Sequence, residues 1–139
     1  MQLVYQVGEL DIDLDNLKYE GVDPDMAAHR FIVELEESSE GFVASIYVAP
    51  VRRHRVIALK HEIDESKIAG GGEIFLDREN RLVLADFSGD YGAVPNYAAK
   101  AFGHIIEDIL EKRGVKITDV LVDMYEEKLN EKWLNLDQI

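Results

Sequence analysis

The sequence has no cysteine and little proline. Its 139 residues include three prolines and one tryptophan. The lack of cysteine excludes a disulfide framework, a thiolate nucleophile and a zinc site with sulfur ligands. No apolar run approaches the ~18–20 residues that a transmembrane helix needs, and the chain does not open with the charged and apolar regions of a secretory signal. We therefore expect a cytoplasmic protein that does not bind membranes.

Positive charge is also scarce, and it is distributed unevenly. Lysine and arginine total 15 against 28 aspartates and glutamates, which gives a net charge of −13. This acidity disfavours nucleic acid and anionic membranes as partners. Residues 1–40, the acidic segment, contain eleven carboxylates and two cations. Residues 41–61, the basic segment, contain no carboxylate and four cations, Arg52, Arg53, Arg55 and Lys60. The basic segment predicts a solvated edge strand, an anion-binding edge or a contact for the acidic segment of a second subunit.

The clearest periodic signal lies in residues 95–113. Apolar residues recur there at steps of three and four, which is typical of a helix with one buried face. Pro95 suits the first turn of this helix and Gly114 suits its end. Residues 82–87 and 115–124 on either side are rich in strand-forming residues. The three segments together predict a βαβ crossover.

The rest of the chain predicts a mixed sheet. A short helix is expected to begin at Asp23-Pro24 and to end at Phe31, and a helical turn is expected in residues 63–69. A terminal helix is expected within residues 125–136. Further strands are expected at residues 2–7, 10–14, 31–36, 42–48, 55–60 and 73–76. The fold class is therefore α+β, a single domain over residues 1–139.

Familiar motifs for metals, nucleotides and nucleophilic serine are missing from the sequence. The alternating aspartates of residues 11–15 resemble the start of a calcium loop, but Asn16 and Val22 stand where such a loop needs glycine and glutamate. His61 is not followed by a second histidine at the spacing of a zinc protease. There is no Walker loop, no Gly-x-Gly-x-x-Gly and no Gly-x-Ser-x-Gly. We predict no metal and no cofactor.

Two glycine-containing motifs resemble the phosphohistidine phosphatase (Janus/Ocnus) family. They are Gly70-Gly71-Gly72-Glu73-Ile74 and, further along, Ser88-x-x-Tyr91-Gly92, which precedes the predicted long helix and a strand. The resemblance covers roughly residues 70–124. It implies an α+β fold in which a histidine is the general base, while the serine loop and an arginine after the glycine triplet hold a phosphate group.

Position by position, this sequence both matches and departs from the family. Ser88 and the Tyr91-Gly92 pair match, whereas Glu73 stands at the position of the arginine and Asp90 at that of a small residue. The catalytic histidine has no counterpart at the family spacing. His54 and His61 are the histidines that lie nearest before the glycine triplet, and they are alternative candidates for the general base.

The two acidic departures favour a protein without catalysis. A helix N-terminus favours an anion by about 0.3–1 kcal/mol, whereas a carboxylate roughly 4 Å from a phosphate opposes it by about 4 kcal/mol at an intermediate dielectric. We therefore expect a non-catalytic interaction or oligomerisation module on a phosphohistidine-phosphatase-like fold. In this hypothesis the acidic and basic segments are complementary surfaces of a homo-oligomer or of a complex with a protein partner.

The alternative is a phosphatase-like enzyme, or an anion-binding protein with a phosphate-containing ligand. His61 or His54 would then accept a proton, the 88–92 loop would hold the phosphate, and arginines would neutralise its charge. The anion-binding residues would be Ser88, Gly89, Tyr91, Gly92, Arg52, Arg53 and Arg55. The position of the two histidines relative to Ser88 is the observation that bears most directly on this alternative.

Overall fold

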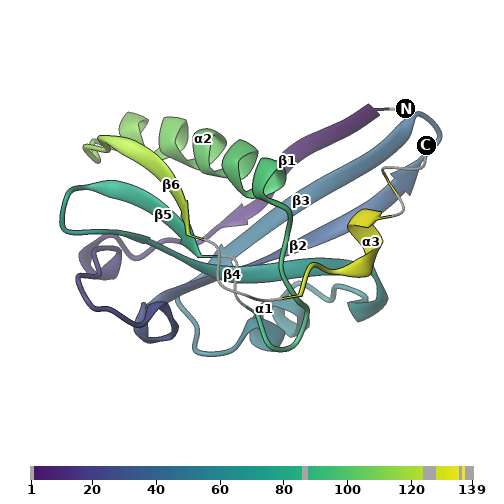
Figure 1. Ribbon diagram of the computed structural model, residues 1–139, viewed down its shortest axis with the longest axis horizontal. Helices are drawn as coiled ribbons and strands as arrows, with labels where there is room; N and C mark the ends of the chain where they lie inside the picture. The colour runs from purple at the N-terminus through teal and green to yellow at the C-terminus, as the bar shows by residue number, and fades with distance from the viewer. Residues whose placement is uncertain (1, 86–87, 124–127, 135, 137–139) are drawn as a thin grey trace.

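The computed structural model describes residues 2–85, 88–123, 128–134 and 136 of the chain. All six of its named strands join one mixed sheet in the order β1-β3-β2-β4-β5-β6 (Figure 1). The pairs β1–β3 and β5–β6 are parallel, and the pairs in between are antiparallel. The predicted α+β class with a mixed sheet is thereby confirmed.

The elements follow one another along the chain as strands, short helices and one long helix. The strands are β1 (Gln2–Leu10), β2 (His29–Ser38), β3 (Gly41–Ala49), β4 (Ile68–Leu76), β5 (Arg81–Ala85) and β6 (Asp119–Asp123). The α-helices are α1 (His54–Lys60), α2 (Asn96–Lys112) and α3 (Glu131–Leu134), and the single-turn 3₁₀ helices are η1 (Leu14–Asn16), η2 (Pro24–Met26) and η3 (Glu65–Lys67). Helix α2 lies on one face of the sheet and α1 on the other (Figure 1). None of the described helices is long and apolar enough to cross a membrane.

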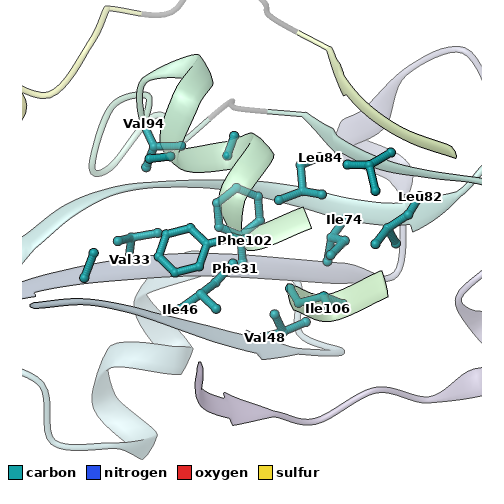
Figure 2. Close-up of a cluster of buried hydrophobic side chains, with 14 of the residues drawn as sticks. Phe31, Val33, Ile46, Val48, Ile74, Leu82, Leu84, Val94, Phe102 and Ile106 are labelled. Carbon is teal, nitrogen blue, oxygen red and sulfur yellow. The ribbon is translucent and has the colours of Figure 1, made fainter. Parts of the chain in front are cut away.

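The α2 face of the sheet carries the main hydrophobic core. Phe102 and Ile106 of α2 are fully buried against side chains of the sheet such as Phe31 and Ile46 (Figure 2). The ring of Phe102 also meets Tyr5 of β1 edge to face, with ring centroids 5.2 Å apart. The predicted βαβ crossover is confirmed, since α2 connects the parallel strands β5 and β6. Pro95 is the N-cap of α2 rather than part of its first turn.

The predicted strand over residues 55–60 is wrong, because this segment forms helix α1. The buried residues of α1 are His54, Ile57 and Ala58, which have the i, i+3, i+4 spacing of one helical face. The three arginines of the basic segment therefore lie just before and within this helix. They belong to no strand. The preceding strand β3 is not a sheet edge either, because it pairs with β1 on one side and with β2 on the other.

The predicted strand over residues 10–14 is also wrong. Strand β1 already ends at Leu10, and the single turn η1 follows. A carboxylate oxygen of Asp13 accepts a hydrogen bond from the Asp15 backbone amide at 3.2 Å and caps this turn. Short acidic side chains that bond to nearby backbone favour turns over strands even where apolar residues alternate with them.

The predicted helix over residues 23–31 is reduced to the single turn η2, because strand β2 already begins at His29. The first five residues of β2 are all buried, since β2 is an interior strand with covered faces on both sides. The helical turn predicted in residues 63–69 is confirmed only as η3, and β4 begins directly after it, at Ile68.

The later predicted elements are present with shorter bounds. Strand β5 ends at Ala85, and residues 86–87 of the predicted strand lie outside the described residues. Strand β6 covers only five residues of the predicted 115–124. The terminal helix is confirmed as α3, while residues 124–127 and 135 lie outside the described part of the chain.

Candidate functional site

The α1 face of the sheet differs from the α2 face because it contains a buried polar cluster. We use this name for Arg30 on β2, His54 at the start of α1, Glu73 on β4 and Ser88 after β5, all of which are buried. Apolar side chains around Ile32 form one small group on this face, and those around Phe75 form another. Along the chain, Arg30 and Glu73 each lie between a residue of one group and a residue of the other. The two residues are direct cross-strand neighbours.

Gly71 brings His54 and Ser88 together. A Cβ atom at Gly71 would lie 2.6 Å from the Phe31 carbonyl oxygen, 3.1 Å from Cδ2 of His54 and 3.4 Å from Cβ of Ser88. The backbone contact leaves no room for a side chain, so glycine is required here. The two side chains therefore flank the same point of β4. The glycine triplet, predicted to precede a strand, lies within β4 instead.

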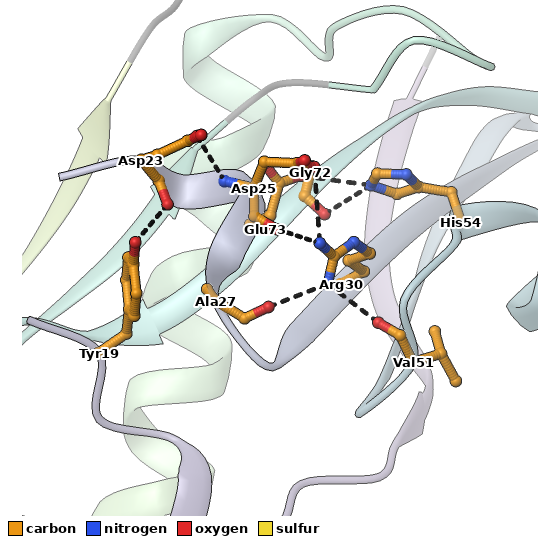
Figure 3. Close-up of polar contacts among 9 residues, drawn as sticks. All are labelled: Tyr19, Asp23, Asp25, Ala27, Arg30, Val51, His54, Gly72 and Glu73. Carbon is orange, nitrogen blue, oxygen red and sulfur yellow. Dashed lines mark hydrogen bonds and ion pairs between the residues drawn. The ribbon is translucent and has the colours of Figure 1, made fainter. Parts of the chain in front are cut away.

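The imidazole of His54 is fixed by two oxygen atoms of β4. Its Nε2 atom lies 2.8 Å from the Gly72 carbonyl oxygen and 3.4 Å from Oε2 of Glu73 (Figure 3). Because His54 is the first residue of α1, the backbone of the helix start sets where the ring enters the cluster. Only 10% of the His54 side chain is exposed, so the cluster is largely shielded from water.

Glu73 is the most unusual member of the cluster. Its side chain is fully buried, and neither carboxylate oxygen has a hydrogen-bond partner of good geometry among the described residues. Burial raises the pKa of the Glu73 carboxyl, while His54 and the charge of Arg30 act in the opposite direction. A buried carboxylate without full hydrogen bonding is costly. The residue therefore calls for a functional explanation.

Arg30 is anchored by backbone oxygens. Its Nη1 donates to the carbonyl oxygens of Ala27 at 2.9 Å and Val51 at 3.0 Å, and its Nη2 donates to the carbonyl oxygen of Asp25 (Figure 3). The Asp25 carboxylate lies 3.5 Å from the same Nη2. These contacts hold the guanidinium in place beside Glu73.

The 88–92 loop folds back on itself and is attached to β4. Gly92 donates its amide to the Ser88 carbonyl oxygen at 2.8 Å, and Tyr91 donates its amide to Oγ of Ser88 at 3.3 Å. The Gly71 amide in turn donates to the Gly92 carbonyl oxygen at 3.1 Å. The amides of Gly89 and Asp90 have no acceptor within the described part of the chain. Both of these residues are exposed, and backbone amides in such turns are groups that can bind an anion.

Side chains from α1 and η3 hold the outer side of this loop. The Tyr91 hydroxyl donates to Oε1 of Glu65 at 3.1 Å, and Nε of Arg55 donates to the same oxygen at 3.0 Å. A hydrogen bond with Tyr91 and the nearby carboxylates of Glu65 and Asp90 raise the pKa of Arg55. Of the three predicted arginines, Arg55 is thus the one that contacts the loop.

Residues beyond β6 hold the other side of the loop. Nδ2 of Asn130 donates to the Tyr91 carbonyl oxygen at 2.6 Å, and the Ala93 amide donates to the Lys128 carbonyl oxygen at 3.0 Å. The indole Nε1 of Trp133 donates to the Ala69 carbonyl oxygen at 2.5 Å. We call residues 128–133 the strap, because they join the loop to β4.

The other predicted site residues lie elsewhere. Nε2 of His61 is 3.2 Å from Oε2 of Glu9, and its ring packs on Tyr47 with centroids 5.0 Å apart. Arg52 lines a cavity of about 310 Å³ that Arg30 also lines. Arg53 is exposed and forms the N-cap of α1. The structure therefore places His54 beside Ser88 and gives His61 a different set of neighbours.

Sequence reasoning missed Arg30, and it assigned Glu73 no positive role. The available signal for Arg30 was a cation directly before the apolar residues 31–33, where a charge is unexpected unless it is paired. No group of three or more histidines and carboxylates among the described residues has the geometry of a metal site.

Comparison with protein-family models, curated proteins and solved structures finds no match for this chain.

Proposed function

We propose that this chain hydrolyses the bond between a phosphoryl group and its leaving group, with His54 as the general base and the 88–92 loop as the anion-binding element. The observation that carries the proposal is that His54 and Ser88 flank Gly71, with Nε2 of the histidine held by β4. A fixed histidine next to a loop whose backbone amides can bind an anion is suited to activating water for attack on a bound phosphoryl group.

The charges around the loop are compatible with a phosphate. Glu73, which stands at the position of the arginine in the phosphohistidine phosphatases that the sequence resembles, lies 3.4 Å from Nε2 of His54 and has no exposed surface. Asp90 is exposed near the guanidinium of Arg55, which partly offsets its negative charge. The backbone amides of Gly89 and Asp90 then supply the hydrogen bonds that an anion needs.

Ser88 has a supporting role in this proposal rather than a nucleophilic one. Its side chain is fully buried and its oxygen accepts the Tyr91 amide. The edge of His54 nearest to the shared Gly71 point is the carbon Cδ2, which cannot take a proton from a hydroxyl. Water is therefore the nucleophile, and Ser88 shapes the loop.

The test is hydrolysis of a phosphohistidine-containing peptide, followed by phosphate release. The unmodified protein should release phosphate, and His54→Gln should lower the rate by about 10²–10⁴-fold, which is the usual contribution of a general base. His61→Gln should change the rate little, because its ring contacts Glu9 and Tyr47 instead. His104→Gln, on the exposed side of α2, is the matched control. Absence of turnover by the unmodified protein, or equal loss in all three variants, would contradict the proposal.

A second candidate is the interaction module that the charge distribution predicts. The observation that favours it is a surface hollow of about 300 Å³ on the sheet, lined by Glu34, Glu36 and Glu37 among others. Burial and the neighbouring Glu36 raise the pKa of Glu34, as expected where carboxylates gather. Arg52 and Arg53 are exposed cations that a second copy could place against such a surface.

This second candidate is tested by the oligomeric state. It predicts a dimer or larger assembly by light scattering at low salt, which dissociates as salt screens the charges. The double variant Arg52→Glu and Arg53→Glu should prevent assembly, whereas Lys100→Glu, on α2, should not. A monomer at low salt without a protein partner would remove this candidate and leave the enzymatic proposal unaffected.

A further inference from the structure

The starting observation is that Nε2 of His54 faces two acceptors at once. The Gly72 carbonyl oxygen and the Glu73 carboxylate oxygen can only accept hydrogen bonds, so a lone pair on Nε2 would be repelled by both. Neutral histidine carries one proton on one of its two ring nitrogens. The contacts therefore favour the proton on Nε2, and the lone pair of the neutral ring lies on Nδ1.

The Glu73 carboxylate is buried without the hydrogen bonds that would offset the cost of its burial. It is fully buried on an interior strand, and its two oxygens lack well-formed hydrogen bonds to any described residue. A buried carboxylate beside a histidine has one clear electrostatic effect, because it stabilises the imidazolium that forms when the other nitrogen takes a proton.

The groups that face Glu73 come from three elements. His54 belongs to α1, Arg30 is the cross-strand neighbour on β2, and Asp25 belongs to η2. His54 and Arg30 favour the ionised carboxyl, whereas burial and Asp25 favour its protonated form. The positive charge of Arg30 thus favours the ionised carboxyl even before His54 is protonated. Arg30 is held in place independently by backbone oxygens.

We infer that Glu73 is a positioning residue for His54: with the Gly72 carbonyl it keeps the ring proton on Nε2 and leaves the lone pair on Nδ1 for the proton transfer. This inference rests on the proposed function. As a water O–H bond breaks, its proton moves to Nδ1 and its oxygen bonds to phosphorus. The bond from phosphorus to the leaving atom breaks, and the leaving atom keeps the electron pair. Nδ1 later returns the proton to the leaving group or to solvent.

The experiment combines nitrogen NMR with kinetics on the full chain. Long-range proton–nitrogen spectra identify the tautomer of each of the four histidines, and the signals of His54 are assigned by their loss in His54→Gln. We expect the Nε2–H tautomer for His54. In Glu73→Gln the share of the Nε2–H tautomer should fall, because one of the two acceptors that face Nε2 is lost.

The kinetic effect should fall on kcat rather than on KM, because Glu73 acts through His54. We expect Glu73→Gln to lower kcat by about 10–100-fold, less than the roughly 10⁴-fold loss in serine proteases that lack the triad aspartate, since the Gly72 carbonyl remains. Glu73→Asp should restore part of the activity. The matched control is Glu107→Gln, because Glu107 pairs with His104 on the exposed side of α2 at 3.3 Å. It should leave kcat and the His54 signals unchanged.

Each outcome decides one claim. The Nδ1–H tautomer in the unmodified protein, or a tautomer balance that Glu73→Gln leaves unchanged, would overturn the inference. The tautomer measurement needs no variant other than His54→Gln, so poor folding of a Glu73 variant does not prevent this test. If the Nε2–H tautomer and its loss in Glu73→Gln are found but no phosphoryl compound is hydrolysed, the proposed function fails while the relation between Glu73 and His54 stands.

Discussion

The two faces of the sheet follow opposite rules. On the α2 face, one continuous set of aliphatic and aromatic side chains joins the long helix to the strands. On the α1 face, two small apolar groups leave space between them in which Arg30, Glu73 and His54 are buried together. The difference teaches that the α2 face supplies stability, which frees the α1 face to hold charged groups that are costly to bury.

The largest effect is expected on the α2 face. Phe102→Ala should lower the free energy of unfolding by about 3–5 kcal/mol, because the removed ring leaves a cavity that the rigid sheet fills only in part. Urea unfolding at neutral pH measures this loss. Leu59→Ala is the control, since the Leu59 side chain on α1 is largely exposed and its loss should change stability by roughly 0.5 kcal/mol or less. Similar losses in both variants would contradict the division between the faces.

The next effect concerns Glu73 and the pH dependence of stability. Because burial raises the pKa of the folded carboxyl above its ordinary 4.5, the folded state binds this proton more tightly, and its contribution is lost as pH rises through the folded pKa. Glu73→Gln removes this loss. Compared with the unmodified protein, it should therefore become relatively more stable from pH 5 to pH 8, by about 1.4 kcal/mol for each unit of pKa shift. A constant difference across that range would show that the carboxyl is not perturbed.

A smaller effect is expected at His29, a polar exception that shares its face of β2 with Phe31. Its Nε2 accepts the Asp13 amide at 2.9 Å, which requires a neutral ring. Burial lowers the pKa of His29, against the opposing charges of Asp13 and Asp11. Its contribution to stability is thus complete above pH 6.5 and is lost as pH falls toward the lower folded pKa.

His29→Gln should flatten this acid dependence below pH 6.5, because glutamine does not titrate. At neutral pH it should cost about 1 kcal/mol if the amide bond of Asp13 is not replaced. Thermal unfolding at several pH values gives both quantities. An unchanged slope would mean that another group causes the acid loss.

The smallest effect is expected for the exposed ion pair on α2. Nζ of Lys112 lies 3.2 Å from Oδ2 of Asp108, and both side chains are mostly exposed. Asp108→Asn should therefore change the free energy of unfolding by less than about 0.5 kcal/mol. A loss above 1 kcal/mol, measured by urea unfolding, would show that surface charge matters more on this face than its apolar core suggests.

The sequence was most informative where one periodic pattern had a single structural meaning. The long helix and its flanking strands were predictable because the apolar spacing, Pro95 and Gly114 agreed. Prediction failed for residues 55–60, where Val56 and Ile57 favour a strand locally but His54, Ile57 and Ala58 bury one helical face. It also failed near Asp13, where bonds from a side chain to nearby backbone override the alternation of apolar residues.

The candidate site was predictable only in part. The resemblance of the glycine motifs to a known family directed attention to Ser88 and to two histidines, but it did not identify which histidine lies beside the loop. That choice depends on α1, whose helical character was not foreseen. Arg30 and Glu73 are cross-strand neighbours 43 positions apart, and their pairing follows from the sheet register rather than from any local pattern.

The strap has a consequence for the order of folding. The 88–92 loop precedes α2 in the chain, yet it is held by residues 128–133, which follow β6. Local contacts and the hairpins can form before contacts that close such a long segment, because loop closure costs entropy. We therefore expect the loop to acquire its final shape after α2 and β6 have docked. Partly folded molecules would have an apolar core but no ordered 88–92 loop, so amide protection of this loop should appear after that of the core during refolding.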